Sequence, residues 1–349
     1  MEVNIEKRQR ILQLVKEGID NGYFPCAAVA VGSREKLHFI EYLGNRSIKP
    51  EVLPLEMDTL FDMASLTKVM ATTPLFLKFL QEGKISLYDK ISEYVEITEE
   101  KNEINILNLL THTAGFKPYV LFEKVCKSYN ASIKYIGKEP LICKPSSKVI
   151  YSDFSFILLG HILEQIGKDT LDNLCKKHVF DPIGMKHTSF NPTSKMAVAT
   201  ELNKETGKML MGNVHDENAR FFGGVSGHAG MFSTIEDTAM YASMLLNRGK
   251  LNGESFMSQN EFNIMIKNYT TGLNEARGLG WNLNVDKMTS GNELILPKAF
   301  SHTGFTGTSI WVDIKNDIFA VLLTNRVHPT RDNTRILRFR RSFYNAIYN

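Results

Sequence analysis

The strand-forming segments of this 349-residue chain lie near its two ends, and a long helical stretch separates them. They are short apolar runs bounded by turn residues, at residues 26–31, 37–43, 279–283, 309–313 and 318–323. Between about residues 84 and 268, the pattern predicts helical segments that are broken by loops. A single antiparallel sheet built from both ends of the chain satisfies this order, with the helical stretch inserted between its strands.

Amphipathic helices are predicted at both termini, where they would cover the sheet. Residues 5–21 and 336–347 space apolar side chains along one face, and we expect the arginines of the second segment on a solvated face. The predicted fold class is α/β: an antiparallel sheet built from both chain ends, flanked by terminal helices, with an inserted all-helical domain. We expect a discontinuous sheet domain at 1–65 and 270–349, a mainly helical domain at 66–269, and a site at their seam.

Ser65 and Lys68 are three residues apart, at the point where a loop gives way to a helix. Pro50 and Pro54 mark the loop, and residues 69–80 are apolar almost all round, as in a buried helix. Residues i and i+3 share a helix face, so the Lys68 ammonium can reach the Ser65 hydroxyl. The helix N-terminus adds free N–H groups that favour a developing oxyanion. Alone, S-x-x-K is a weak pattern, and a capping serine followed by a surface lysine is the structural interpretation that it favours.

Three further stretches place polar residues and glycines in unusual positions. Tyr151 to Asp153 directly precedes an apolar helix, where a structural interpretation makes Asp153 the N-cap. His302 to Thr308 precedes a strand, where its glycines also fit a bulge or a close backbone approach. Residues 222–230 form a glycine-rich loop before a helix, but it lacks the G-K-[ST] ending of a phosphate-binding loop.

The order of these motifs is that of a known superfamily. S-x-x-K, then a Y-x-N-like and a K-T-G-like motif at these separations resemble the serine β-lactamase and DD-peptidase superfamily, and within it the class C β-lactamase-like serine hydrolases. Residues 109–115 (LLTHTAG) and 151–160 (YSDFSFILLG) match that family's typical sequence. The resemblance covers residues 20–325. It implies an α/β sheet domain with an all-helical insert, in agreement with the arrangement of the strands.

A narrower resemblance is to amidases of peptidoglycan recycling, which cut between N-acetylmuramic acid and the L-alanine of the attached peptide. The matching stretches are residues 214–219, 227–230, 302–308 and 323–329. This resemblance implies that His215, Asp216 and His228 line a substrate cleft.

The superfamily resemblance also implies roles for individual residues. Ser65 would be the acylated nucleophile, Lys68 would take its proton or hold the local charge, and Tyr151 would act as general base or acid. The backbone N–H groups of Ser65 and Phe305 would form the oxyanion hole. The predicted substrate-binding residues are Asp153, His302, Thr303, Gly304, His215, Asp216 and His228.

Two positions depart from the superfamily pattern. Asp153 stands where asparagine is usual, and a carboxylate beside Lys68 favours the ammonium and raises the pKa of Lys68. The role of general base therefore shifts towards Tyr151. His302 stands where penicillin-recognising members carry lysine, and an ordinary histidine is mostly neutral near pH 7. We therefore expect weak β-lactamase and DD-carboxypeptidase activity.

The remaining polar clusters have structural alternatives. His215, Asp216, Glu217 and His228 are of metal-binding types, but their spacing is not H-E-x-x-H, and a substrate-cleft lining or a plain loop accounts for them as well. We predict no metal and no organic cofactor. His112 is expected to bond backbone groups in its tight loop rather than to catalyse.

Composition limits the partners. The net charge of +3 is too small to indicate nucleic-acid binding, and no basic run with interleaved aromatics occurs. The apolar runs are too short to span a membrane, and no signal peptide is visible, so the sequence as it stands predicts a cytoplasmic protein. A removed leader would instead place it outside the cytoplasm.

The function expected from the sequence is that of a serine hydrolase. It would cleave an amide or ester through an acyl-enzyme, on a small molecule or a muropeptide, as a MurNAc-peptide amidase does. The enzymatic alternatives are a broad-specificity esterase, a weak class C β-lactamase or a penicillin-binding protein. The non-enzymatic alternative is a penicillin-sensing binding domain. The sequence leaves the oligomeric state open.

Overall fold

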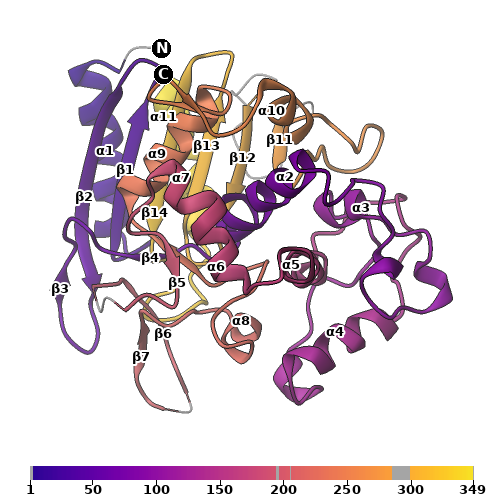
Figure 1. Ribbon diagram of the computed structural model, residues 1–349. Helices are drawn as coiled ribbons and strands as arrows, with labels where there is room; N and C mark the ends of the chain where they lie inside the picture. The colour runs from indigo at the N-terminus through magenta and orange to yellow at the C-terminus, as the bar shows by residue number, and fades with distance from the viewer. Residues whose placement is uncertain (1–2, 194–195, 205, 285–298, 349) are drawn as a thin grey trace.

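The computed structural model describes residues 3–193, 196–204, 206–284 and 299–348. A seven-stranded antiparallel sheet forms its centre, with the strand order β11-β12-β13-β14-β1-β2-β3 (Figure 1). The strands are β1 Cys26–Gly32, β2 Leu37–Ser47, β3 Leu53–Pro54, β11 Asn282–Asn284, β12 Ala299–Thr303, β13 Ser309–Asp313 and β14 Ile318–Thr324. The two ends of the chain meet where β1 pairs with β14, and this confirms the predicted sheet.

The central strands are apolar throughout because both faces of the sheet are covered. Side chains alternate between the faces along a strand. Val29 of β1 and Leu322 of β14 belong to the hydrophobic cluster under the terminal helices. Their neighbours Ala30 and Val321 belong to the larger core on the opposite face. Strands buried on both faces read as continuous apolar runs rather than as alternating ones.

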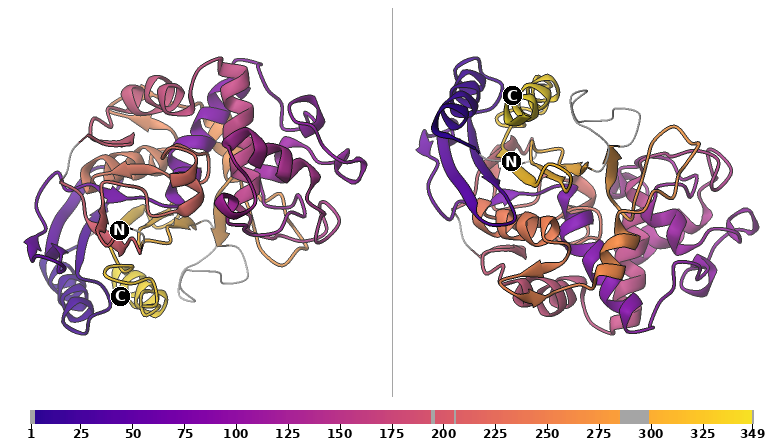
Figure 2. Two further views of the ribbon diagram at one scale, coloured as in Figure 1. Left: turned by 90° about the horizontal axis from the view of Figure 1, so that it is seen from below. Right: turned by 90° about the horizontal axis from the view of Figure 1, so that it is seen from above.

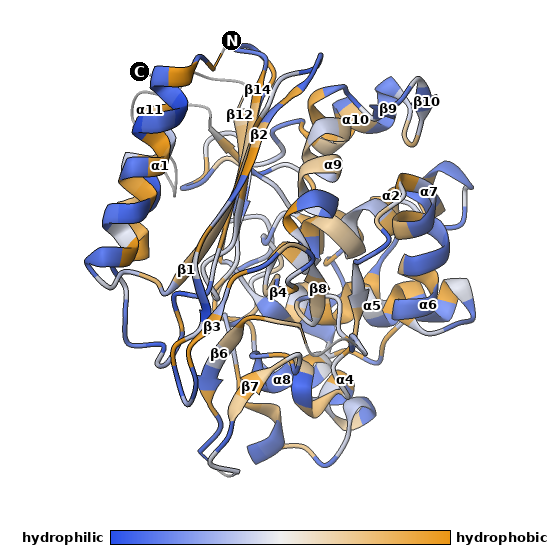
Figure 3. Cartoon of the chain, turned by 90° about the vertical axis from the view of Figure 1, so that its left-hand side faces the viewer, coloured by the Kyte–Doolittle hydropathy of each residue, from blue (hydrophilic) through white to orange (hydrophobic). Residues whose placement is uncertain are grey.

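Helices α1 (Ile5–Asp20) and α11 (Ile336–Tyr348) cover one face of the sheet, and α9 (Ile235–Leu246) covers the other (Figure 3). Helix α9 begins directly after Thr234, whose side chain accepts a hydrogen bond from the Asp237 N–H and so caps the helix. None of the described helices has the length and apolar character needed to cross a bilayer.

The buried face of α11 differs from the prediction at one residue. Ile336, Phe339 and Phe343 are buried as expected. Arg340 is buried as well, with 4% of its surface exposed, so the expected solvated face does not include this arginine. The reason is geometric: position 340 follows Ile336 by four residues and therefore lies on the same stripe of the helix.

The segment between the sheet's two halves is mainly helical, and Figure 2 shows most of it gathered beside the sheet, away from α1 and α11. Its helices include α2 Thr73–Gln81, α3 Ile106–Leu110, α4 Tyr129–Lys138, α5 Asp153–Gly167, α6 Leu171–Cys175, α7 Asp181–Ile183, α8 Glu217–Phe221 and α10 Gln259–Met265. It also contains short strands, namely β4 Phe61–Asp62, β5 Ser189–Phe190, β6 Ala199–Leu202, β7 Met209–Met211, β8 Met231–Ser233, β9 Lys250–Leu251 and β10 Glu254–Ser255. Runs of two to four residues are too short to show a periodicity, which explains why the sequence did not predict them. The division into two domains stays a prediction.

Candidate active site

Ser65 lies at the start of the helical turn that leads into α2. The chain reaches it through β4, which pairs with β8, and the Met63 N–H donates to the Met231 carbonyl at 2.9 Å. Residues 68–72 take a π-helical conformation, which is rare in proteins and occurs frequently at functional sites. Ser65 thus stands at the entry to a buried helix, as the sequence predicts.

A buried carboxylate holds the backbone just before Ser65. Asp62 accepts hydrogen bonds from the Ala64 N–H at 2.8 Å and from the His215 N–H at 2.7 Å. Burial raises the pKa of Asp62, although both of these bonds oppose the shift. Ala64 has a φ of +46°, a left-handed conformation that a residue with a side chain rarely adopts. The strain is therefore located one residue before the candidate nucleophile, where structures commonly store it.

Lys68 is fully buried, and its ammonium donates hydrogen bonds in three directions. The acceptors are Ser65 Oγ at 3.0 Å, Asp153 Oδ1 at 2.8 Å and the His228 carbonyl at 3.0 Å. Burial lowers the pKa of Lys68, but Asp153 and Tyr151 together raise it by more, so the pKa lies above its usual value. Lys68 is therefore a charged donor to Ser65 at neutral pH, as expected from the carboxylate at position 153.

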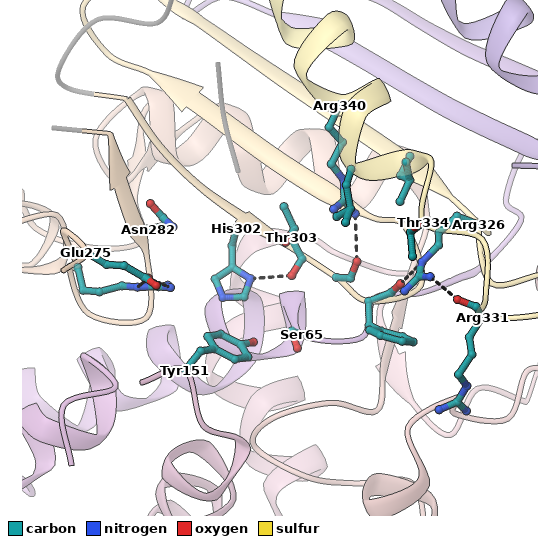
Figure 4. Close-up of a pocket in the computed structure, with 15 residues that line it drawn as sticks. Ser65, Tyr151, Glu275, Asn282, His302, Thr303, Arg326, Arg331, Thr334 and Arg340 are labelled. Atoms are coloured by element: carbon teal, nitrogen blue, oxygen red, sulfur yellow. Dashed lines mark hydrogen bonds and ion pairs between the residues drawn. The ribbon is translucent and has the colours of Figure 1, made fainter. Parts of the chain in front are cut away.

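Tyr151 lies two residues before the start of α5, and Figure 4 shows its hydroxyl pointing toward Ser65. The Lys68 Nζ lies 4.9 Å from the centroid of the Tyr151 ring, and the Arg277 guanidinium carbon lies 5.7 Å from it. The ring of His112 packs against the Tyr151 ring with centroids 4.4 Å apart. Positive charge thus surrounds the tyrosine.

The contacts around Tyr151 decide between the interpretations that the sequence allowed for His112 and Asp153. His112 Nδ1 accepts a hydrogen bond from the Ser152 N–H at 3.2 Å, which agrees with the expected backbone role of this histidine. The N-cap of α5 is Ser152, so the structural interpretation of Asp153 as an N-cap is wrong. Asp153 is the first residue of the helix, and its carboxylate is directed to Lys68 instead.

The loop after β12 packs directly behind the Ser65 segment. Thr306 Oγ1 donates to the Asp62 carbonyl at 2.7 Å, and Thr308 Oγ1 donates to the Met63 carbonyl at 3.2 Å. A Cβ on Gly304 would lie 2.6 Å from the Met63 carbonyl oxygen, so only glycine fits at this contact. Within the described part of the chain, no backbone carbonyl accepts from the N–H of Ser65 or of Phe305. Both groups remain available to a ligand.

His302 stands near the end of β12, a strand that the sequence did not predict. Its Nδ1 donates to the Thr303 carbonyl at 3.1 Å, which leaves Nε2 as a buried nitrogen without a partner among the described residues. Burial, together with the charges of Lys68 and Arg277, holds the pKa of His302 well below its usual value. His302 is therefore a neutral hydrogen-bond acceptor rather than a fixed positive charge.

Ser65 opens into a cleft of about 560 Å³ (Figure 4). Of the residues predicted for the site, the cleft is lined by Ser65, Tyr151, His302, Thr303, Gly304 and Phe305. The others lie beside or beneath it, namely Lys68, Asp153, His215, Asp216 and His228. The arrangement can supply a nucleophile, a tyrosine that exchanges protons, and two N–H donors for an oxyanion.

The predicted histidine and aspartate cluster forms two contacts with carboxylates beside the cleft. His228 Nε2 lies 2.9 Å from Asp216 Oδ1. Burial raises the pKa of Asp216, but His228, the Ala219 N–H and Lys68 together hold it below its usual value. His215 Nε2 lies 3.1 Å from Glu201 Oε2. The His215 ring also stacks on Phe305, with centroids 5.7 Å apart. The cluster therefore supports the wall of the cleft.

One group of possible metal ligands occurs here. Asp153, Asp216 and His228 each bring a ligand atom within 4.8 Å of the others. However, the Lys68 ammonium already lies 2.8 Å from Asp153, and His228 Nε2 is engaged by Asp216 at 2.9 Å. A buried ammonium in the same place repels a metal cation, so these ligands fit a charge network better than a metal site.

The family model for beta-lactamases matches residues 11–344. The chain belongs to the beta-lactamase family. A relative from Salmonella heidelberg (strain SL476), described as "Putative D-alanyl-D-alanine carboxypeptidase", is 33% identical over 315 residues, which is 80% of this chain and 72% of that relative. The family and this relative identify the protein as a hydrolase of the serine beta-lactamase and DD-peptidase type.

Solved structures share the fold of this beta-lactamase family member. A class C beta-lactamase mutant superposes with a TM-score of 0.80 at 19% identity and covers 99% of both chains. EstCE1, described as a hydrolase with promiscuous acyltransferase activity, superposes with a TM-score of 0.78 at 17% identity and covers 98% of both chains. The resemblance seen in the sequence is thus confirmed at the level of the superfamily, whereas the narrower amidase subgroup stays a prediction.

The sequence did not predict that four arginines line the cleft of this family member: Arg277, Arg326, Arg331 and Arg340. Arg331 forms ion pairs with Glu201 and Glu217, both at 2.6 Å, and Arg277 pairs with Glu275. The only signal for Arg340 was its place on the apolar stripe of α11. The other three belong to loops, where no periodicity reports which way a side chain points.

Proposed function

We propose that this protein cleaves an amide or ester bond of a peptidoglycan-derived fragment through an acyl-enzyme on Ser65. The bond between N-acetylmuramic acid and L-alanine is the first candidate, because the narrower sequence resemblance points there. The observation that carries the catalytic part is the hydrogen bond of 3.0 Å from the charged Lys68 to Ser65 Oγ, at the base of an open cleft.

The charge on Lys68 decides the order of proton transfers. An ammonium that donates to Ser65 cannot take the serine proton, so Tyr151 is the base. The Ser65 oxygen attacks the substrate carbonyl while the Tyr151 phenolate takes the Ser65 proton and becomes a neutral phenol, and the N–H groups of Ser65 and Phe305 bind the oxyanion. Lys68 and Arg277 stabilise the Tyr151 phenolate that this step consumes. Tyr151 then protonates the leaving group, and water releases the acyl group by the reverse sequence.

The environment of His302 supports a substrate without a carboxylate next to the cleaved bond. Its free Nε2 accepts a hydrogen bond and offers no positive charge. A substrate N–H or O–H group suits this nitrogen, whereas the carboxylate of a β-lactam or of a terminal D-alanine does not. A second candidate is a D-alanyl-D-alanine carboxypeptidase, which the description of the Salmonella relative favours.

The test is to incubate the protein with MurNAc-peptides, peptides ending in D-Ala-D-Ala and a panel of short acyl esters, each beside Ser65→Ala. Release of N-acetylmuramic acid by the unmodified protein alone is expected. If MurNAc-peptides survive while only the esters are cut, the substrate is wrong and an esterase remains. Release of D-alanine supports the carboxypeptidase. Mass spectrometry would reveal a persistent acyl adduct on Ser65 if the protein were a penicillin sensor instead.

A further inference from the structure

Two buried arginines that line the cleft also pack against the loop that carries Phe305. Arg326 follows β14, and Arg340 belongs to α11, with 7% and 4% of their surfaces exposed. Among the described residues, neither guanidinium has a carboxylate within 4.0 Å, whereas the neighbouring Arg331 has two. Their hydrogen bonds go to backbone carbonyl oxygens instead.

The bonds of Arg340 fall on both ends of the loop. Its Nη2 donates to the Gly304 carbonyl at 3.1 Å, the bond that Figure 4 marks with a dashed line at Arg340, and to the Thr308 carbonyl at 3.0 Å. On the other side of the same loop, Arg326 Nε donates to the Phe305 carbonyl at 2.7 Å. The loop is therefore fixed from outside by two cations and from inside by the Ser65 segment.

The Gly304 carbonyl and the Phe305 N–H belong to one peptide unit. That unit is planar, and its C=O and N–H point in opposite directions. Holding the oxygen against Arg340 therefore directs the N–H away from α11. A hydrogen bond to the carbonyl also polarises the peptide and makes its N–H a stronger donor.

Burying the charge of Arg340 costs free energy, and the hydrogen bonds of its guanidinium offset only part of that cost. Burial lowers the pKa of Arg340 to about 10, so the guanidinium stays charged at neutral pH. Its Nε is buried without a partner among the described residues. A buried cation without a counter-ion destabilises a resting protein. The same cation stabilises negative charge that develops nearby in a transition state.

We propose that Arg340 is a positioning residue for the oxyanion hole: through the Gly304 carbonyl it orients and polarises the Phe305 N–H that binds the oxyanion. This inference rests on the proposed function, because it requires acylation of Ser65. It assigns Arg340 no direct contact with the substrate. Arg326 holds the opposite side of the same loop, so each arginine restrains one flank of the Phe305 peptide.

The test compares Arg340→Met and Arg340→Lys with Arg341→Gln. Arg341 is exposed on the next position of α11, so its variant controls for loss of a cation from this helix. With p-nitrophenyl butyrate, Arg340→Met should lower kcat about 10- to 100-fold, which is less than the 10²–10³-fold typical of losing an oxyanion donor outright. KM should stay within about threefold, since the substrate is not touched. The lysine variant should recover part of the loss, and Arg341→Gln should match the unmodified protein.

A second measurement separates positioning from damage to the fold. A ¹³C-labelled trifluoromethyl ketone forms a hemiketal on Ser65 whose oxygen occupies the oxyanion hole. In Arg340→Met, the NMR-detected ionisation of that hemiketal should move to higher pH, and inhibition should weaken by the same factor as kcat. An unchanged ionisation, or a raised KM for carboxylate-bearing substrates with kcat intact, would overturn the inference.

The two proposals fail in different ways. If the unmodified protein forms no acyl or hemiketal adduct on Ser65, the proposed function fails and this inference fails with it. If the adduct forms normally but Arg340→Met ionises and turns over like the unmodified protein, only the role of Arg340 is refuted.

Discussion

Replacing Asp153 by asparagine should destabilise the protein in a way that depends on pH. The Lys68 side chain is fully buried, and Asp153 is its only ion-pair partner among the described residues. Asparagine keeps an oxygen that accepts the ammonium's hydrogen bond but removes the negative charge. The variant therefore isolates the electrostatic part of this contact.

The size of the effect follows from the surroundings of Lys68. Removing one partner of a buried ion pair costs about 3–5 kcal/mol. We expect the lower end, about 3 kcal/mol at pH 7, because Asp153 is 18% exposed and the Asp216 carboxylate lies within 4.8 Å of it. The hydrogen bonds to Ser65 Oγ and the His228 carbonyl also remain.

The sign of the pH dependence follows from the pKa of Lys68. In the unmodified protein this pKa is raised, so its stabilising contribution is complete below the usual value of 10.5 and disappears only above it. In Asp153→Asn, burial lowers the pKa and the main opposing charge is gone. The folded variant then releases the proton before the unfolded chain does, so its deficit in unfolding free energy should shrink as the pH rises towards 10.5.

Urea unfolding at pH 7 and at pH 9.5 measures both quantities. The matched control is Asp20→Asn, because Asp20 pairs with Lys16 at 3.1 Å on the surface of α1, where both side chains are about 60% exposed. The control should change the unfolding free energy by no more than about 0.5 kcal/mol at either pH. A deficit for Asp153→Asn that is equal at both pH values would refute the assignment of a charged Lys68.

Three further predictions concern the chemistry. Tyr151→Phe should lower kcat for an activated ester about 10²–10⁴-fold with the fold unchanged by circular dichroism, and near-normal turnover would exclude Tyr151 as the base. Gly304→Ala places a Cβ 2.1 Å from Thr308 Oγ1 and 2.6 Å from the Met63 carbonyl, so we expect kcat to fall about 100-fold or more, and an unaffected rate would count against an oxyanion hole in this loop. His302 should show no imidazole titration by NMR between pH 6 and 8, because burial and two neighbouring cations hold its pKa well below the usual value. Nitrocefin hydrolysis should accordingly be slow, and rapid turnover would contradict the neutral His302.

The long apolar patterns could be predicted from the sequence, whereas the N-cap of α5 could not. Residues 26–31 and 318–323 are apolar at every position because both sheet faces are covered. Such a run can be recognised in the sequence even when the elements that cover the strand are unknown. Strands of two to four residues lacked enough positions to reveal a period, and β12 beside the site was not predicted either.

The sequence by itself determined the order of Ser65, Lys68, Tyr151 and the residues 302–304, and with it the superfamily, because these signals are short motifs at fixed separations. Only the tertiary structure decided which groups meet and how deeply they are buried. Lys68 meets Asp153 across 85 positions of the chain, and Arg340 meets Gly304 across 36. Burial and the distance between charges set the protonation of Lys68 and His302, and both arise only when distant segments pack together.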